Sequence, residues 1–338
     1  MSGQPKLVIG ANGFLGSHVT RQLVADGHDV RAMVRDGANT IGIDDLGVKK
    51  FLGDIWDNDT LREAMDGCDD VYYCVVDTRG WLRDPAPLFH TNVDGTRNVL
   101  DVAKTVGLRK FVFTSSYVTV RRRRGHRASE ADVITSERGL TPYVRSRLQA
   151  EKIVLAYAKE HGLPAVAMCV STTYGTGDWG RTPHGAIIAG AAFGKLPFVM
   201  SGIELEAVGV EDAARAMILA AEHGKSGERY LISEKTISNA DVARIAAEAA
   251  GTPPPAKSIP LPLSYAMAIA GSVKAKLRGT DELLSLGSLR LMRAEAPVDN
   301  GKAIRELGWQ PRPVEDSIRE AAQFWVGLRE AKRKSKAG

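Results

Sequence analysis

The sequence predicts an α/β fold: a Rossmann-type, doubly wound parallel sheet with a smaller, mostly helical C-terminal lobe. Two observations predict it. In the first half of the chain, apolar segments of strand length alternate with segments of helical periodicity. Those apolar segments are nearly continuous, as is typical of parallel strands covered on both faces. After the sixth of them the alternation stops, and Gly- and Pro-rich stretches and helices follow, which predicts a second lobe.

Each element of the first half has a local justification. The expected strands are Lys6–Ile9, Val30–Val34, Lys49–Leu52, Val71–Val76, Lys110–Phe113 and Ala165–Val170. The expected helices are Leu15–Asp26, Thr60–Met65, Val93–Val106 and Tyr143–His161. Three of these helical segments are followed by Gly27, Gly107 and Gly162, as is common where a helix ends. Later in the chain we expect strands over Glu206–Val210 and Arg229–Ser233, a helix over Asp212–His223, and another helix after Ser238.

Composition excludes several classes of protein. Of 338 residues, 44% are hydrophobic and 25% charged, which is ordinary for a globular protein and excludes a disordered chain, a collagen and a coiled coil. Three cysteines, without a CxxC pair, cannot form a disulfide framework, so we expect a reducing, cytoplasmic location. We also expect no targeting segment and no transmembrane segment. The histidines show no metal-ligand spacing, so no metal is expected.

The net charge of +5 resides in two short segments. The segment 121–127 (RRRRGHR) and the tail 329–338 (REAKRKSKAG) hold most of the excess cations, and the remaining chain carries about −4. The body is therefore mildly acidic, which excludes a uniformly basic nucleic-acid binder, and we expect no nucleic-acid partner.

A glycine-rich loop follows the first expected strand and opens the first helix. Gly10, Gly13 and Gly16 have the spacing in which glycines permit a tight turn, close approach of a pyrophosphate, and close packing of helix on strand. The helix N-terminus then offers free N–H groups to phosphates. The loop also contains the expected cofactor-binding residues Asn12, Phe14 and Leu15. The alternative is a purely structural turn.

The residues at the ends of the second and third strands are candidates for binding the adenosine part of a dinucleotide. Arg35 stands where an NAD site usually has an acid, and a guanidinium suits the 2′-phosphate of NADP. NADP (NADPH) is therefore favoured over NAD, although Asp36 follows directly; the alternative for Arg35 is an ordinary surface charge. Asp54 and Ile55 can accept from the adenine amine and cover its ring, or form a simple turn and helix cap.

Five segments, in this order, resemble the motifs of the extended short-chain dehydrogenase/reductase family, the NAD-dependent epimerase/dehydratase superfamily. They are Gly10–Gly16, Gly53–Ile55, Asn92–Val99, Thr114–Ser116 and Tyr143–Arg147, and the resemblance covers roughly residues 5–325. The segments 30–35 and 208–213 most resemble the dihydroflavonol reductase and 3β-hydroxysteroid dehydrogenase branch. The segment 300–311 is similar to a C-terminal signature shared with nucleotide-sugar epimerases.

The resemblance implies specific roles. Tyr143 would be the catalytic acid/base and Ser116 the hydroxyl that holds the substrate oxygen, with Ser115 as the fallback. The alternative for Tyr143 is an aromatic residue on the surface of an amphipathic helix, and the alternative for Ser116 is a cap at the end of the strand. Tyr143 and Arg147 would also contact the cofactor. Val75, Val76 and Val170 would line the cofactor, although relatives commonly have smaller residues near the first two and a proline after the last strand.

Position 147 departs from the family's Tyr-x-x-x-Lys motif because it is arginine. Arginine keeps the positive charge that lowers a tyrosine pKa, but it cannot relay a proton through its own nitrogen. Three outcomes follow: catalysis with a repositioned cation, slow catalysis, or cofactor binding without turnover.

The resemblance also divides the chain. Residues 1–170 and 203–236 would form the NADP-binding core, 171–202 and 237–328 the substrate lobe, and 329–338 a disordered basic tail. The arginines of 121–127 would overlook the substrate and attract an anionic group, or simply be solvated charges. The segment Tyr265–Leu277 would pack on the core, line an apolar pocket, or rest on a membrane surface.

The expected activity is an NADP(H)-dependent oxidoreduction of a secondary alcohol and a ketone on an apolar, cyclic, steroid- or flavonoid-like substrate. The alternatives are a nucleotide-sugar epimerase or dehydratase, and a cofactor-binding protein with weak or no turnover. The expected partner is a small-molecule substrate, either apolar or anionic. The sequence does not decide whether the protein forms a homodimer or contacts a membrane surface.

Overall fold

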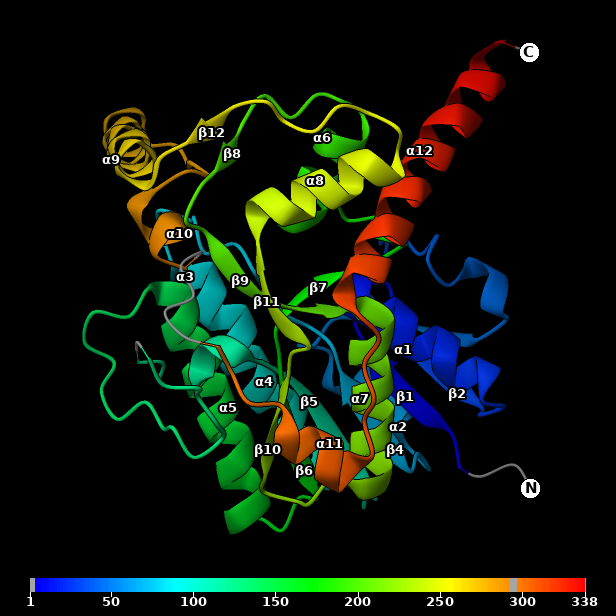
Figure 1. Ribbon diagram of the computed structural model, residues 1–338. Coiled ribbons are helices and arrows are strands. Elements are labelled where there is room, and N and C mark those ends of the chain that lie inside the picture. The colour runs from blue at the N-terminus through cyan, green and yellow to red at the C-terminus, as the bar shows by residue number, and fades with distance from the viewer. Residues whose placement is uncertain (1–3, 124, 292–296, 338) are drawn as a thin grey trace.

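A seven-stranded, wholly parallel sheet forms the centre of the computed structural model, which describes residues 4–123, 125–291 and 297–337. Its strand order is β10-β6-β5-β4-β1-β2-β3 (Figure 1). The strands are β1 (Lys6–Ile9), β2 (Val30–Val34), β3 (Lys49–Leu52), β4 (Asp70–Tyr73), β5 (Lys110–Ser116), β6 (Ala165–Val170) and β10 (Arg229–Ile232). The predicted α/β class and parallel sheet are confirmed.

Four strands differ from their predicted bounds. β10 ends at Ile232 rather than Ser233, and the strand expected over Glu206–Val210 spans Glu204–Gly209. β4 ends at Tyr73 rather than Val76, because its last ladder bond runs from the Cys74 N–H to the Ile9 carbonyl (2.9 Å). β5 continues to Ser116 because its register with β6 pairs Ser116 with Val170.

Helices cover both faces of this sheet. On one face lie α1 (Phe14–Ala25), α7 (Val210–His223) and α11 (Gly301–Leu307). On the other lie α2 (Asn58–Met65), α4 (Thr96–Ala103) and α5 (Pro142–Glu160). Successive strand residues, such as Leu7 and Val8, belong to opposite clusters because side chains alternate across a strand. The expected helix over Val93–Val106 is replaced by a π-helical segment, His90–Gly95, followed by α4.

The second lobe contains two small sheets. One has the order β11 (Lys235–Ser238), β9 (Glu204–Gly209), β7 (Thr172–Tyr174), and the other pairs β12 (Ser258–Ile259) with β8 (Val199–Met200). Its helices are α6 (Pro183–Ala192), α8 (Asn239–Ala249), α9 (Leu261–Arg278), α10 (Leu286–Leu291) and α12 (Val314–Ala337). The range 203–236, assigned wholly to the core from sequence, is therefore divided: α7 and β10 pack with the core, but β9 joins the lobe's sheet.

The basic tail requires a correction. Residues 329–337 continue α12 as helix rather than forming a disordered end, and Figure 1 shows this helix projecting from the body toward the C-terminus. Lys, Arg, Ala and Glu are strong helix formers, and cations near a helix C-terminus interact favourably with its dipole.

Helix α9 packs less completely than expected. Only Ser264 and Ala268 of this helix are buried, while its large side chains Leu263, Ile269, Val273 and Leu277 are 50% or more exposed. Among the described residues, no helix is long and apolar enough to cross a membrane.

Candidate active site

The loop between β1 and α1 requires glycine at defined positions. Gly10 has a φ of +81°, in the left-handed region that favours glycine. A Cβ atom on Gly16 would lie 2.2 Å from the Gly10 carbonyl oxygen, so any side chain there would force the helix away from the strand. Gly13 caps α1 without a side-chain hydrogen bond. The first amides of this helix are therefore available to a phosphate-bearing ligand.

The sheet order brings the other predicted cofactor residues to the same edge. Because β1 lies between β4 and β2, and β3 follows β2, the carboxyl ends of these strands are neighbours. Arg35 is exposed at the end of β2, and Asp54 follows β3 beside the buried Ile55. In the described chain, no carboxylate lies within ion-pair distance of Arg35. Its guanidinium is therefore not committed to a structural salt bridge.

The remaining loop and strand-end positions line the same edge. Asn12 donates to the Asn39 carbonyl (3.3 Å), which ties the glycine loop to the loop after β2. The Cγ2 atom of Val75 lies 3.0 Å from where a Cβ on Gly10 would be. Val76, the next residue in the chain, is partly buried. Val170 is the last residue of β6 and pairs with Ser116 of β5.

Two serines end β5, and their environments distinguish them. The Ser115 hydroxyl donates to Glu151 Oε2 (2.5 Å) and is buried. The Ser116 Oγ only accepts a long hydrogen bond from the Val118 N–H (3.5 Å). Neighbouring side chains on a strand point to opposite faces. Ser116 therefore remains free to bind a substrate oxygen, whereas Ser115 is committed to the core.

Tyr143 is held in the first turn of α5. Thr141 caps this helix by accepting from the Val144 N–H (3.4 Å), and Pro142 occupies the first helical position, where its missing N–H costs nothing. Tyr143 is partly buried and packs against the apolar cluster that contains Tyr117 and Val118. Tyr117 and Val118 directly follow Ser116 in the chain, so Ser116 immediately precedes a segment that packs against Tyr143.

Arg147 lies one helical turn after Tyr143 and is completely buried. One of its nitrogens, Nη2, donates to the Thr114 carbonyl, and the guanidinium lies over the Phe113 ring at 5.2 Å. Nε and Nη1 have no hydrogen-bond partner among the described residues. Burial lowers the Arg147 pKa, and the nearby Tyr143 opposes this shift.

These features fit a dinucleotide. A buried cation with two unpartnered N–H groups suits a ligand that brings hydroxyl groups, such as a nicotinamide ribose. At the other end of the edge, the cradle over Gly10 and Gly16 admits a pyrophosphate that a Cβ would exclude. Gly10, Gly13, Gly16, Arg35 and Arg147 would therefore hold the cofactor.

The structure adds a functional residue, Asn92, to which the sequence analysis assigned no role. Its side chain accepts from the Asp77 N–H (2.8 Å) and donates to the Asp77 carbonyl (2.9 Å) and the Ser146 hydroxyl (3.1 Å). The Ser146 hydroxyl in turn donates to the Tyr143 carbonyl (2.9 Å). This chain connects the loop after β4 to the turn of α5 that holds Tyr143. The sequence indication was that Asn92 opens one of the segments that carry the family resemblance, Asn92–Val99.

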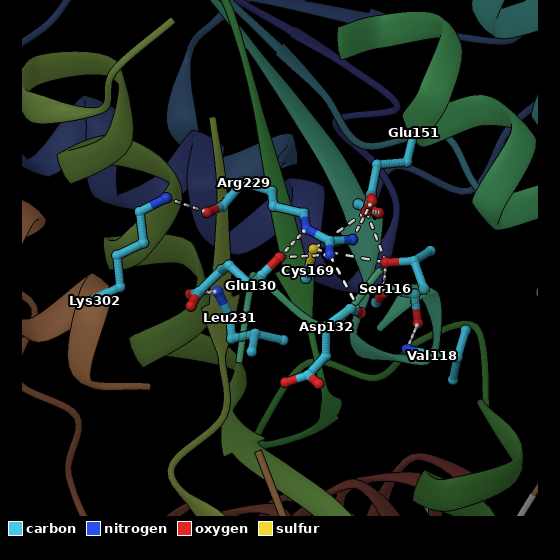
Figure 2. Close-up of polar contacts among 11 residues, drawn as sticks. Ser116, Val118, Glu130, Asp132, Glu151, Cys169, Arg229, Leu231 and Lys302 are labelled. Atoms are coloured by element: carbon cyan, nitrogen blue, oxygen red, sulfur yellow. Dashed lines mark hydrogen bonds and ion pairs between the residues drawn. The ribbon is translucent and has the colours of Figure 1, made fainter. Parts of the chain in front are cut away.

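A buried carboxylate, Glu151, was also missed. It lies one turn after Arg147 and accepts from Ser115, from Thr119 (2.7 Å) and from the Cys169 thiol (3.2 Å). Its second oxygen pairs with Arg229 Nη1 at 2.9 Å. Figure 2 shows Arg229 between Glu151 and the backbone carbonyls of the 130–132 segment. The sequence indication was an acidic residue on the buried face of a helix, which requires a partner.

A metal centre has no support in the described part of the chain, where no three His, Cys, Asp or Glu side chains form a group that could hold an ion.

Known proteins match this chain over most of its length. A putative dihydroflavonol 4-reductase from Synechocystis sp. is 29% identical, over 94% of this chain and 93% of its own length. Sterol demethylase protein B from Methylococcus capsulatus is 27% identical, over 94% of this chain and 97% of its own. The Bos taurus sterol-4-alpha-carboxylate 3-dehydrogenase, decarboxylating, is 28% identical over 64% of this chain and 60% of its own.

Solved structures share the fold. The crystal structure of gox2253 has a TM-score of 0.84 and 32% identity, covering 96% of this chain and 98% of that one. A UDP-glucose 4-epimerase from Thermotoga maritima has a TM-score of 0.79 at 19% identity, covering 96% and 99%, and shows the fold alone. The family model described as "NAD dependent epimerase/dehydratase family" matches residues 6–233. The chain therefore belongs to the NAD-dependent epimerase/dehydratase family, the extended short-chain dehydrogenases/reductases.

Proposed function

We propose that this protein is an NADP(H)-dependent oxidoreductase that interconverts a secondary alcohol and a ketone on an apolar, cyclic substrate. One arrangement carries the proposal: the segment that directly follows Ser116 packs against Tyr143, the Ser116 hydroxyl donates to no group among the described residues, and the buried Arg147 cation lies one helical turn after Tyr143. The relatives named for dihydroflavonol and sterol chemistry support a ring-containing substrate.

The chain's residues divide the reaction between them. In the reductive direction, the Ser116 hydroxyl donates a hydrogen bond to the substrate carbonyl oxygen, and the Tyr143 hydroxyl transfers its proton to that oxygen. The Arg147 charge stabilises the phenolate that Tyr143 then becomes. When bound, the nicotinamide supplies the hydride. In the oxidative direction Tyr143 takes the proton back.

The preference for NADP rests on Arg35. Its guanidinium is exposed at the end of β2, beside the loop that Asn12 ties down, and a 2′-phosphate would find a cation there. Replacing Arg35 by Ser should raise the KM for NADPH about tenfold or more while changing that for NADH little. Asp36→Ala is the matched control and should leave the KM for NADPH unchanged. A wild-type preference for NADH would overturn the role of Arg35.

The test of the proposed function is turnover of NADPH and NADH with a panel of cyclic ketones, against Tyr143→Phe. We expect NADPH-dependent reduction that falls about 100-fold or more in the variant, because the proton donor is lost. Tight NADPH binding with no turnover above the variant would instead indicate a cofactor-binding protein without activity. Retention of NAD with binding of a nucleoside-diphosphate sugar would indicate an epimerase or dehydratase.

A further inference from the structure

One arginine of the segment 121–127 differs from its described neighbours. Arg121, Arg123 and Arg127 are exposed, whereas Arg122 is only partly so. Its guanidinium carbon lies 5.1 Å from the centroid of the Tyr117 ring. Its Nη1 nitrogen is buried and has no hydrogen-bond partner among the described residues. Arg124 lies outside the described residues.

Tyr117 connects this cation to the reacting residues. It directly follows Ser116 in the chain, and its ring belongs to the buried cluster against which Tyr143 and Val144 pack. Burial raises the Tyr117 pKa, and the charge of Arg122 opposes that shift, which is consistent with the close approach of the two groups. Tyr117 therefore carries Arg122 against its ring and belongs to the same cluster against which Tyr143 packs.

The nearby carboxylates accept hydrogen bonds from other donors. The buried Glu206, whose charge acts on Tyr117, accepts from the Ser233 hydroxyl (2.6 Å) and from the Thr236 hydroxyl. Asp132 accepts from His126 Nε2 (3.0 Å) and from Ser129 (2.9 Å), and Glu130 Oε1 accepts from the Leu231 N–H (2.8 Å). No ion pair to Arg122 occurs within the described ranges. A partly desolvated guanidinium without a counter-ion is unfavourable by itself, and an anion placed beside it removes that cost.

The loop backbone holds the cation in place. The Arg121 N–H donates to the Asp132 carbonyl (2.8 Å), and Val120 forms a bridge with Val133. This short strand-like pairing therefore fixes the backbone directly before Arg122. A single inward guanidinium balances the single charge of a carboxylate, whereas a phosphate dianion would need more cations than the described residues direct inward.

We propose that Arg122 binds a carboxylate on the substrate, so that the substrate is a cyclic oxo acid or its hydroxy acid. This inference rests on the proposed function, since it assigns the substrate class of the same site. Ser116 and Tyr143 would act on the ketone while the guanidinium of Arg122, stacked on Tyr117, pairs with the carboxylate on another ring carbon. Neutral ketones of the same shape would bind more weakly.

The experiment compares 3- and 4-oxocyclohexanecarboxylate with their methyl esters as substrates for the full-length protein and NADPH. For Arg122→Met we expect kcat/KM for the better acid to fall about tenfold or more, mainly through KM, while that for its ester changes less than about twofold. Arg122→Lys should recover part of the loss. Arg123→Met is the matched control from the same loop and should behave as the wild type with both substrates.

Equal losses on acid and ester, or an equal loss in Arg123→Met, would overturn the inference, because either would show a structural or a general electrostatic effect. If the wild type turns over neither these compounds nor any ketone of the panel, the proposed function fails. Calorimetric binding of the same acid and ester to the NADPH-loaded protein then still tests Arg122: tighter binding of the acid that Arg122→Met abolishes supports the carboxylate site, and equal binding contradicts it.

Discussion

The Glu151 carboxylate and the Arg229 guanidinium form an ion pair of 2.9 Å inside the core, with side chains only 2% and 10% exposed. Glu151 comes from α5, and Arg229 comes from the edge strand β10, which is followed by β6 and β5 in the sheet order. The same carboxylate accepts from the Cys169 thiol on β6 and from the Ser115 hydroxyl on β5. Glu151 therefore joins the helix that carries Tyr143 and Arg147 to β10 through the ion pair, and to the strand that ends in Ser116 through the Ser115 hydrogen bond.

Breaking this pair should strongly destabilise the fold. Glu151→Gln leaves the Arg229 guanidinium buried without a counter-ion, which should lower the free energy of unfolding by about 3 kcal/mol in urea denaturation. Arg229→Met should cost a similar amount, and the double variant less than the two losses added together. The exposed pair Arg244 and Glu248 is the control, and its removal should cost under about 1 kcal/mol. Strict additivity at Glu151 and Arg229 would contradict direct coupling.

The two serines at the end of β5 should respond differently to alanine. Ser116→Ala removes the hydroxyl that binds the substrate oxygen, so kcat should fall about 100-fold, with little change in the unfolding midpoint. Ser115→Ala leaves a Glu151 oxygen with one donor fewer, so stability should fall by about 1 kcal/mol while kcat changes only a few-fold. Steady-state kinetics and urea denaturation of both variants check this. A larger kcat loss in Ser115→Ala would reverse the assignment.

Arg147→Lys should reduce activity, although lysine is the residue of the family motif. The site is fitted to a guanidinium, which donates to the Thr114 carbonyl and lies over the Phe113 ring. A lysine ammonium cannot stack in this way, so we expect kcat to fall about tenfold and the free energy of unfolding by about 1 kcal/mol. Arg145→Lys, at an exposed position on the same helix, is the control. A gain in rate would show that Arg147 is a handicap.

Acid should destabilise the protein through His184 on α6. Burial lowers its pKa to about 4, and its Nδ1 has no hydrogen-bond partner within the described chain. The unfolded chain, with a pKa of about 6.5, then binds more protons than the folded chain between these values. The contribution of His184 to stability is therefore full above pH 6.5 and is lost as the pH falls toward 4.

The difference between wild type and His184→Gln isolates this effect. From pH 7 to pH 4 the wild type should lose about 3 kcal/mol more of its unfolding free energy than the variant. Urea denaturation across this range measures it. His223→Gln, at an exposed position, should follow the wild-type curve. Parallel curves for wild type and His184→Gln would show that His184 is not buried as described.

Much of the site could be predicted because its determinants are local. The spacing of Gly10, Gly13 and Gly16 predicted a phosphate cradle, and the structure gives the reason at Gly16, where a Cβ would meet the Gly10 carbonyl. The strand β2 was predicted with its exact bounds, which placed Arg35 at its end. The basic tail was predicted to be a disordered chain end, whereas its Lys, Arg, Ala and Glu residues favour the helix that continues through it.

The sequence by itself determined the parallel sheet, its glycine loop and the residue types at the reacting centre, because apolar runs and glycine spacing act within a few neighbouring residues. Only the tertiary structure distinguished Ser115 from Ser116 and placed the buried Arg147 guanidinium over the Phe113 ring. It also paired Glu151 with Arg229 and stacked Arg122 on Tyr117. Each of those outcomes depends on which polar groups from distant segments share one desolvated space. A buried donor or acceptor is stable only when such a partner reaches it, and local sequence does not encode that partner.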